Sequence, residues 1–451
     1  MKKVLAIILA VCMMISAVAC SKSNDLSTKT NTNTGAKVTE AVGETADATT
    51  APEETVKLTV IGGGLAEDAF ATAKEANPND ANVLRTEAVK SMYPNIEVDF
   101  QDWGWAEQLD QKQRAAILSG NAPDIVHGEA FMPTYANMDI LSPLPQDIVD
   151  MVEPAFLIKN QKGEPVGVSP RGNIFLLYYN KDIMEAAGID PETPITTWSE
   201  WKKISDQITA KGNGEVFGGG IPSHPHTGGA LRATAFIRQL GADWMKDGAV
   251  TINTPEMIKA LTFIREMDSN YPAGVGNNPD EGPMYTMFND NKTLFCVVNG
   301  TWQTGDAIKK GVNYGVIALP VADGGSANNC LVGFDYYGVP KTSSNQEAAF
   351  DVLRAFVSKE VAEVSIKSDL NPVANKEVLN APETAQIDPS LAAAIQSIKS
   401  GSLTGLVVFE KNDSQIWNVI NTEVLARTTM TKDPIETIVA EAQTKVEDLL
   451  K

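Results

Sequence analysis

The chain has 451 residues, of which 43% are hydrophobic, a proportion typical of a globular protein. It carries 37 Lys and Arg residues against 57 Asp and Glu residues, a net charge of −20. Such a negative field repels nucleic acid and anionic lipid headgroups, so we expect no nucleic-acid partner, but it does not exclude a neutral ligand.

The first twenty residues have the features of an export signal. Lys2 and Lys3 precede an apolar run, 4–18, that is too short to span a membrane. Small residues then lead to Cys20, and this ending resembles the lipobox of bacterial lipoproteins, although Ala17 stands where leucine is usual. We predict a signal peptide over 1–19 and a lipidated Cys20. The alternative is an ordinary secretory signal with a chance cysteine at its end.

Residues 20–55 form the predicted lipid anchor and tether. Nine of the residues in 21–55 are Thr and few are large and apolar, so this segment cannot bury enough surface to offset its ordering entropy. We expect a disordered link between a folded body and the extracytoplasmic face of the cell membrane, where the two acyl chains of a diacylglyceryl group hold firmly.

The roughly 395 residues after the tether exceed what one hydrophobic core usually supports, which predicts two lobes. Beyond the predicted signal and anchor, Cys296 and Cys330 remain. Export permits a disulfide between them, but each stands in an apolar, strand-like stretch. We therefore favour two buried thiols.

The N-terminal part of the body predicts strands that alternate with helices. The strands are 57–61, 96–100 and 124–127; the helical stretches are 65–93, broken near Pro78, and 108–118. This order favours a parallel α/β sheet.

The rest of the chain continues with strands and helices of both kinds. Further strands are predicted at 173–180, 294–299 and 314–319, with helical segments at 182–187, 197–210 and 347–366. Thr197 and Glu200 have the spacing of a capping box. The last helix is expected to begin with Asp433 as its N-cap and Pro434 at its first position.

Catalytic signatures do not appear in the sequence. It has no nucleophile elbow, phosphate loop or zinc helix, and the glycine runs at 62–64 and 218–220 lack dinucleotide-binding spacing. The three histidines, His127, His224 and His226, could together bind a metal, but loop and site-lining roles are favoured. We predict a protein that is not an enzyme and has no cofactor and no metal.

Aromatic residues near predicted strand ends and loops are more informative. They are Trp103, Trp105, Trp302, Tyr336, Tyr337 and Trp417. Sugar rings have apolar faces and polar rims, and they bind flat aromatic side chains that are flanked by polar groups. Trp198 and Trp201, in the first turn of a predicted helix, are assigned to packing instead.

Several segments resemble conserved motifs of one protein family. They are 119–125 (SGNAPDI), 177–183 (LYYNKDI), 187–190 (AGID), 197–200 (TWSE), 298–302 (VNGTW), 314–320 and 332–340. In this order and spacing they resemble the extracellular solute-binding proteins of ABC sugar importers, the group that includes maltose-binding protein.

The resemblance implies a two-lobed α/β fold of the periplasmic-binding-protein type II, each lobe a mixed or parallel sheet flanked by helices, with a ligand cleft between the lobes. Strand crossovers are expected near 169–173 and 333–336, and a third near 380–390. Lobe I would comprise 56–172 and 336–384; lobe II would comprise 173–335 and 385–451.

The resemblance also implies the site. Trp302 matches the family's ring-stacking tryptophan. The other ligand-binding residues would be Trp103, His127, Glu129, Arg171, Asn173, Ser223, His224, Asp335, Tyr336 and Trp417. Two departures from the family's pattern bear on ligand size. The segment 62–93 is longer than expected between the first two strands, and the side chains of 335–337 are bulkier than the small residues common at this place in the family.

The implied function is capture of a sugar or oligosaccharide by lobe closure, as a monomer, for delivery to the permease subunits of an ABC transporter. The alternatives are the same fold with a polyamine, a metal or another small solute, and a surface carbohydrate-active enzyme.

Overall fold

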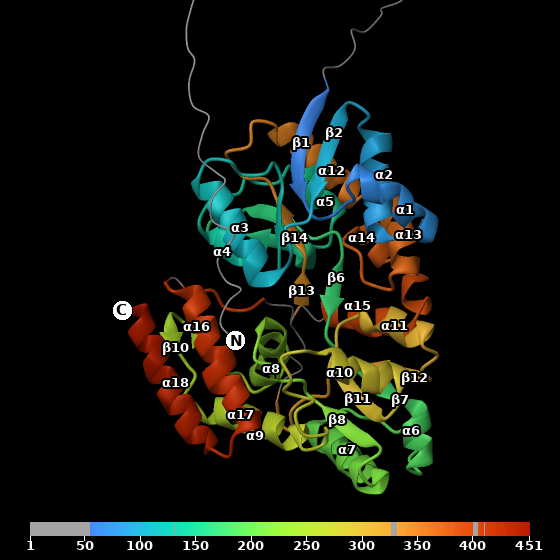
Figure 1. The fold of residues 1–451 in the computed structure, drawn as a ribbon, viewed down its shortest axis with the longest axis vertical. Helices are drawn as coiled ribbons and strands as arrows, with labels where there is room; N and C mark the ends of the chain where they lie inside the picture. Colours follow the sequence, from blue (N-terminus) through green and yellow to red (C-terminus); the bar gives the residue numbers. More distant parts are fainter. Residues whose placement is uncertain (1–54, 130, 326–331, 400–404, 410) are drawn as a thin grey trace, which may run out of the picture. The chain divides into compact units, whose positions relative to one another are not determined.

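The structure, a computed structural model, describes residues 55–451 apart from 130, 326–331, 400–404 and 410 (Figure 1). The predicted signal peptide, Cys20, the tether up to residue 54 and Cys330 lie outside the described residues. Cys296 is a buried free thiol, as predicted, and burial raises its pKa to about 12. In the described part of the chain, no helix combines the length and the apolar character that crossing a membrane requires.

One group of elements, lobe I, is built around two sheets. Its strands are β1 (Val56–Ile61), β2 (Ile96–Gln101), β3 (Val126–Gly128), β4 (Leu157–Lys159), β5 (Pro165–Val168) and β14 (Tyr336–Gly338). Its helices are α1 (Glu67–Ala76), α2 (Ala81–Met92), α3 (Ala106–Leu118), α4 (Met132–Asn137), α5 (Gln146–Met151), the 3₁₀ turn η1 (Pro154–Phe156), α12 (Gln346–Phe356), α13 (Lys359–Ser368) and α14 (Lys376–Leu379).

Segments far apart in the sequence complete lobe I. β1 and β2 pair in parallel, and Val60 bridges Ile125 in parallel, as the alternation of strands and helices predicts. β14 instead pairs antiparallel with β3 and β5 in a sheet of order β3-β14-β5-β4. α12 and α13 pack against α2 (Figure 1). In turn, α2 packs on β2 and α12 packs on β1.

The second group of elements, lobe II, surrounds one mixed four-stranded sheet and also contains a separate two-stranded sheet, β9 with β10. Its strands are β7 (Leu176–Asn180), β8 (Phe217–Gly220), β9 (Met245–Lys246), β10 (Ala249–Val250), β11 (Leu294–Asn299) and β12 (Tyr314–Ile317). Its helices are α6 (Lys181–Ala186), α7 (Trp198–Gly212), α8 (Thr227–Gln239), α9 (Pro255–Asp268), α10 (Gly282–Tyr285), α11 (Gln303–Lys309), α15 (Pro389–Lys399), α16 (Asp413–Val419), α17 (Ala426–Met430) and α18 (Ile435–Leu450). The 3₁₀ turn η3 (Thr384–Gln386) precedes α15, and two π-helical turns, η2 (Thr286–Asp290) and η4 (Ile420–Leu425), continue α10 and α16.

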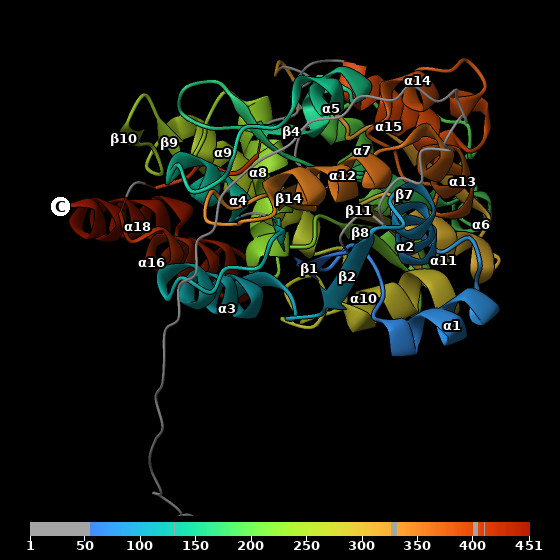
Figure 2. The ribbon, with the colours of Figure 1, turned by 90° about the horizontal axis from the view of Figure 1, so that it is seen from above.

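The main sheet of lobe II has the order β12-β7-β11-β8. Every residue of β7 and β11 is buried, which explains why both strands are continuous apolar runs rather than alternating ones. α7 and α9 pack on β8, α15 packs on β7 and β12, and α16 lies beside α18 (Figures 1 and 2). The predicted capping box of α7 is confirmed, and Trp198 and Trp201 are buried in the core.

Two strands connect the groups. β6 (Gly172–Ile174) pairs antiparallel with β13 (Val332–Phe334), so that Gly172 lies opposite Phe334. The chain passes again between α14, which packs on α13, and α15, which packs on the lobe II sheet. These contacts support the predicted lobe boundaries, which we retain as a proposal.

Three expectations about elements were wrong in detail. The single strand 173–180 divides at Phe175, because Ile174 pairs with β13 whereas Leu176 pairs with β11. The helical run 347–366 divides where the Ser358 side chain caps α13. Asp433 does not cap α18; its carboxylate accepts hydrogen bonds from the Arg427 guanidinium instead.

Candidate functional site

Polar clusters lie at both ends of the β6–β13 crossover. Arg171 precedes β6 and Asp335 follows β13, so both stand at the lobe I end. Phe175 follows β6 at the other end and contacts Arg232 and Trp302 of lobe II. Arg171 and Phe175 are four residues apart on an extended chain, which separates the ends by roughly 13 Å.

The lobe I pocket is a cavity of about 360 Å³ beside the first end. The loops that follow β1 and β2 form much of its wall, together with the end of β3 and the crossover. Its lining includes Gly62, Gly63, Gly64, Asn82, Arg85, Asp102, Trp103, Trp105, His127, Arg171, Asp335 and Tyr337. The segment 62–93 borders this cavity through its glycines and through Asn82 and Arg85 of α2, whereas its Ala-Asn-Pro-Asn-Asp run at 76–80 does not line it.

His127 is held in one orientation at the base of this pocket. Its backbone N–H donates to Gln113 Oε1 at 2.9 Å, and its carbonyl accepts from Gln113 Nε2 at 2.7 Å. The imidazole stacks on Tyr337, with ring centroids 4.6 Å apart, and meets the edge of Trp105 at 5.3 Å. The His127 side chain is 4% exposed, so its polar atoms have little access to bulk water.

Asp335 is the central carboxylate of the lobe I pocket. Its Oδ1 lies 3.9 Å from His127 Nε2, and its Oδ2 lies 4.0 Å from an Arg171 nitrogen. Burial opposes ionisation of Asp335, but the His127 and Arg171 side chains favour it more, and the pKa of Asp335 is lowered. Burial and the Asp335 charge raise the pKa of the neighbouring Glu129 to about 8, so Glu129 is protonated at neutral pH and hydrogen-bonds Asp335.

The glycine run after β1 makes this arrangement possible. Gly62 and Gly63 have φ of +66° and +78°, which side chains rarely adopt. A Cβ atom on Gly62 would lie 3.0 Å from His127 Nδ1, and one on Gly63 would lie 2.5 Å from the Phe356 ring. The glycine run therefore allows the backbone to pack closely against the rings of His127 and Phe356.

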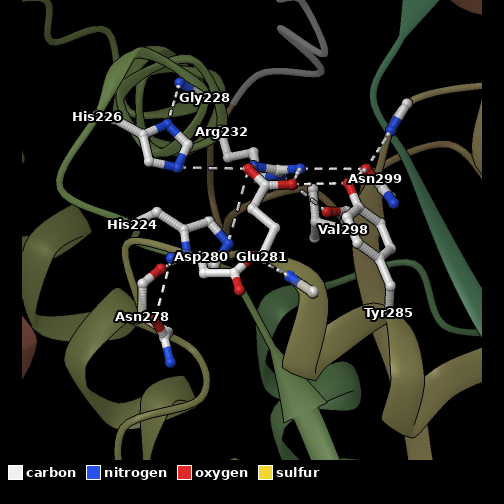
Figure 3. Close-up of polar contacts among 12 residues, drawn as sticks. His224, His226, Gly228, Arg232, Asn278, Asp280, Glu281, Tyr285, Val298 and Asn299 are labelled. Carbon is white, nitrogen blue, oxygen red and sulfur yellow. Dashed lines mark hydrogen bonds and ion pairs between the residues drawn. The ribbon is translucent and has the colours of Figure 1, made fainter.

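The lobe II cluster is centred on a buried ion pair (Figure 3). Arg232, on α8, donates from two nitrogens to the two Glu281 oxygens at 2.8 and 3.1 Å, and also to Asn299 Oδ1 at 3.1 Å. Tyr285 donates to Glu281 Oε2 at 2.6 Å. Although burial opposes it, the Arg232 charge lowers the pKa of Glu281 to about 2, so this carboxylate stays ionised.

Two stacked histidines border the same carboxylate. His224 Nε2 and His226 Nε2 lie 3.8 and 3.6 Å from Glu281 Oε1, and their rings are 5.3 Å apart (Figure 3). His224 Nδ1 bonds the Asn278 carbonyl and must donate to it, which leaves Nε2 unprotonated. Burial and the Arg232 charge lower the pKa of His224 to about 4, so it is neutral at pH 7.

Trp302 presents one ring face beside this cluster. Its six-membered ring covers Gly300, where a Cβ atom would lie 1.9 Å away, and it meets the Phe175 ring at an interplanar angle of 76°. Its Nε1 donates to the Tyr285 hydroxyl at 3.4 Å, and 36% of the residue is exposed. An exposed aromatic face with a phenol, an amide and a carboxylate at its edge suits the apolar face and hydroxyl rim of a sugar ring.

The structure brings seven of the predicted site residues into these two clusters. Trp103, His127, Arg171 and Asp335 line the lobe I pocket, Glu129 bonds Asp335, and Trp302 and His224 belong to the lobe II cluster.

Three predicted residues join neither cluster, and a fourth, Asn173, lies in the crossover itself. Ser223 is buried and its hydroxyl donates to Thr429; Asn173 lies within β6, opposite Gly333. Tyr336 packs edge-on against Phe334, because alternation along β14 turns the adjacent Tyr337 to the pocket instead. Trp417 packs against Trp244 and Phe409.

The sequence reasoning missed several site residues. Asn299 stands directly before the Gly-Thr-Trp motif, and Trp105 and Tyr337 were among the noted aromatics, so a signal existed for these three. Arg85, Arg232, Glu281 and Tyr285 carry no local signal, because helices and a loop that are distant in sequence bring them to the site.

Comparison with known proteins identifies the family and the fold. Residues 63–363 match the family described as bacterial extracellular solute-binding protein. The chain is 26% identical over 169 residues to an arabinooligosaccharide-binding protein of Halalkalibacterium halodurans, an alignment that spans 36% of each chain. It is 23% identical over 341 residues to a maltotriose-binding protein of Pyrococcus abyssi, covering 72% of this chain and 70% of that protein.

Solved structures share the fold. Maltose-bound MalE3 of T. maritima superposes with a TM-score of 0.72 at 20% identity, over 88% of this chain and all of that one. A solute-binding protein of Thermotoga lettingae bound to α-D-tagatose gives a TM-score of 0.69, also at 20% identity, over 88% of this chain and 100% of that chain.

These matches confirm the two-lobed fold class, the extracytoplasmic location that the family's description implies, and the resemblance drawn from the motifs. The chain belongs to the family of bacterial extracellular solute-binding proteins.

Proposed function

We propose that this protein captures a sugar or oligosaccharide between its lobes and delivers it to the permease subunits of an ABC importer. The observation that carries the proposal is the exposed face of Trp302 above Gly300, edged by Tyr285 and Asn299. The lobe I pocket supplies two more tryptophans and hydrogen-bonding groups at the other end of the crossover, roughly 13 Å away along the extended chain. The relatives named for arabinooligosaccharide and maltotriose binding support the same ligand class.

Calorimetric titration against monosaccharides, maltotriose and arabinooligosaccharides tests this function. A sugar from the panel should bind, and Trp302→Ala should weaken that binding by about 1 kcal/mol or more, because the ring face is lost. Ile308→Ala, at an exposed apolar residue on the same α11, is the matched control and should leave affinity unchanged. Absence of heat with every sugar would exclude the proposed ligand class.

Two alternatives are separated by simple observations. A metal as the solute should no longer bind when His127, His224 and His226 are all replaced. A polyamine would bind with a steep dependence on salt, unlike a neutral sugar. The family and its relatives are binding proteins; release of products from a glycan at catalytic protein concentrations would instead reveal an enzyme.

We also propose that Cys20 carries a lipid anchor and that 21–55 tether the body near its permease, which raises the local concentration of loaded receptor. Cys20→Ala should move the protein from the membrane fraction to the medium or periplasm, measured by detergent-phase partitioning. Retention of the variant in the membrane fraction would contradict the anchor. We expect the released protein to be a monomer by light scattering.

A further inference from the structure

Two buried polar atoms of the lobe I pocket lack a hydrogen-bond partner. They are His127 Nε2 and Asp335 Oδ1, on residues that are 3% and 6% exposed. Both residues line the 360 Å³ cavity. A buried polar atom without a partner is costly, so two of them side by side at a cavity indicate a group that the site is built to receive.

The distance between the two atoms restricts what that group can be. They are 3.9 Å apart, too far for a direct hydrogen bond and close enough for one oxygen to lie about 2.8 Å from each. A hydroxyl group can accept a hydrogen bond from the imidazole N–H and donate its own proton to the carboxylate.

The surroundings hold both partners ready for this role. The imidazole cannot turn away, because it is stacked between Tyr337 and the edge of Trp105 and Gly62 packs against its other nitrogen. Arg171 lies 4.0 Å from the other oxygen of Asp335, Oδ2, and Oδ1 has no hydrogen-bond partner, so Oδ1 remains available.

Resting on the proposed function, we propose that one ligand hydroxyl docks between His127 Nε2 and Asp335 Oδ1 and that this pair determines which sugars bind. A sugar that lacks this hydroxyl, or that carries it in the opposite configuration, leaves both buried atoms unpaired and is rejected. Trp103 and Trp105 form the adjacent wall of the pocket against which the same ring packs.

The charges around the gap favour a neutral hydroxyl over an ammonium group. Arg171 stands 4.0 Å from Asp335 and 3.3 Å from Asp369, and Arg85 is buried at the same wall. Glu129 is protonated, so the two guanidinium groups balance Asp335 and Asp369. The further carboxylate of the lining, Asp102, is exposed to solvent and accepts a hydrogen bond from the Gly104 N–H. A cationic ligand in the gap would have to approach two arginines directly.

The first measurement reads the pair directly. The chain contains three histidines, so histidine-selective ¹⁵N labelling gives an Nδ1 and an Nε2 signal for each of three imidazoles, and His127→Gln identifies the pair that belongs to His127. Addition of glycerol, a neutral polyol, should shift the His127 Nε2 signal. Asp335→Asn should abolish the shift, whereas 1,3-diaminopropane should not produce it. Asp139→Asn makes the same chemical change at an exposed residue with φ of +57°, which Asn tolerates, and should preserve the shift.

The second measurement uses a panel sugar that binds in calorimetry. His127→Gln and Asp335→Asn should each weaken its binding about tenfold to a hundredfold. The double variant should lose little more sugar affinity than the single variant that binds more weakly, because both side chains hold the same hydroxyl. One monodeoxy form of that sugar should bind the wild type poorly. The Asp335→Asn variant should bind that monodeoxy form and the parent sugar with equal affinity.

The outcomes separate this inference from the proposed function. Sugar binding that neither substitution weakens would overturn the inference and leave the function standing. A polyol shift at His127 that needs Asp335, with no sugar of the panel bound, would uphold the pair and reject the sugar panel. A shift with diaminopropane alone, or with neither probe, would overturn the docking of a hydroxyl.

Discussion

At the residue scale, the lobe II cluster places the Arg232–Glu281 ion pair beside the buried, neutral imidazole of His224. Arg232 is 1% exposed and its bidentate partner Glu281 is the only carboxylate in the described residues that ion-pairs with it. Removing one member of such a pair leaves a buried charge unpaired and is strongly destabilising. The cluster therefore couples the stability of lobe II to the protonation of its members.

His224 makes this coupling measurable. The folded protein holds its pKa near 4, against an ordinary value of 6.5, so between pH 6.5 and 4 the unfolded chain binds a proton that the folded chain does not. The free energy of unfolding should thus fall on acidification through this window, by on the order of 3 kcal/mol from this group. Glu281 acts lower: its contribution is present above pH 4.5 and is lost as the pH falls toward 2.

Urea denaturation at pH 7, 5.5 and 4 checks this prediction. His224→Gln should remove most of the decline between pH 6.5 and 4. His226→Gln, which changes the more exposed member of the stacked pair, should retain most of it. Equal pH profiles for His224→Gln and the wild type would show that His224 is not the group responsible.

At the element scale, helix ends show how far local signals reach. The Thr197 side chain accepts from the Glu200 N–H, and the Glu200 carboxylate accepts from the Thr197 N–H at 3.0 Å, as the capping box predicts. The Asp433-Pro434 pair carried an equally clear local signal, yet Asp433 bonds Arg427. A charged partner from another helix outweighed a cap that the sequence alone favoured.

The capping box gives a prediction for α7. Thr197→Ala should lower the free energy of unfolding by about 1 kcal/mol, because the first-turn N–H groups lose their acceptor. Chemical denaturation measures the change, and Lys203→Ala, at an exposed position of the same helix, is the control. A Thr197→Ala variant as stable as that control would mean that packing of Trp198 and Trp201 alone holds the helix start.

At the scale of the whole molecule, the crossover strands connect the two lobes and are flanked by residues of both clusters. β6 and β13 carry Arg171 and Asp335 at one end and lead to Phe175 at the other. A sugar that contacts both ends would draw the lobes together, since each cluster supplies only part of its contacts.

Small-angle X-ray scattering of the compact unit Glu53–Lys451 checks lobe closure. The radius of gyration should decrease when a sugar that binds in calorimetry is added. Trp302→Ala should show a smaller decrease at the same sugar concentration. An unchanged radius at saturation would argue for binding without closure.

Much of the fold was predictable from particular stretches of sequence. β1, β2, α3 and β11 follow from apolar periodicity, and the capping box of α7 follows from residue spacing, because these signals act over a few neighbouring residues. The motif Val298–Trp302 likewise placed Trp302 correctly at the end of a buried strand.

The remainder was decided by tertiary structure. The break at Phe175 depends on which distant strands pair with Ile174 and Leu176. The Arg232–Glu281 pair joins residues 49 apart, and the His127–Asp335 pair joins β3 to a crossover that returns some 200 residues later. The sequence alone therefore indicated the pattern of an export signal, most of the helices and strands, and the family. Only long-range contacts decided which polar atoms converge, because no local rule records a partner that the fold supplies from elsewhere.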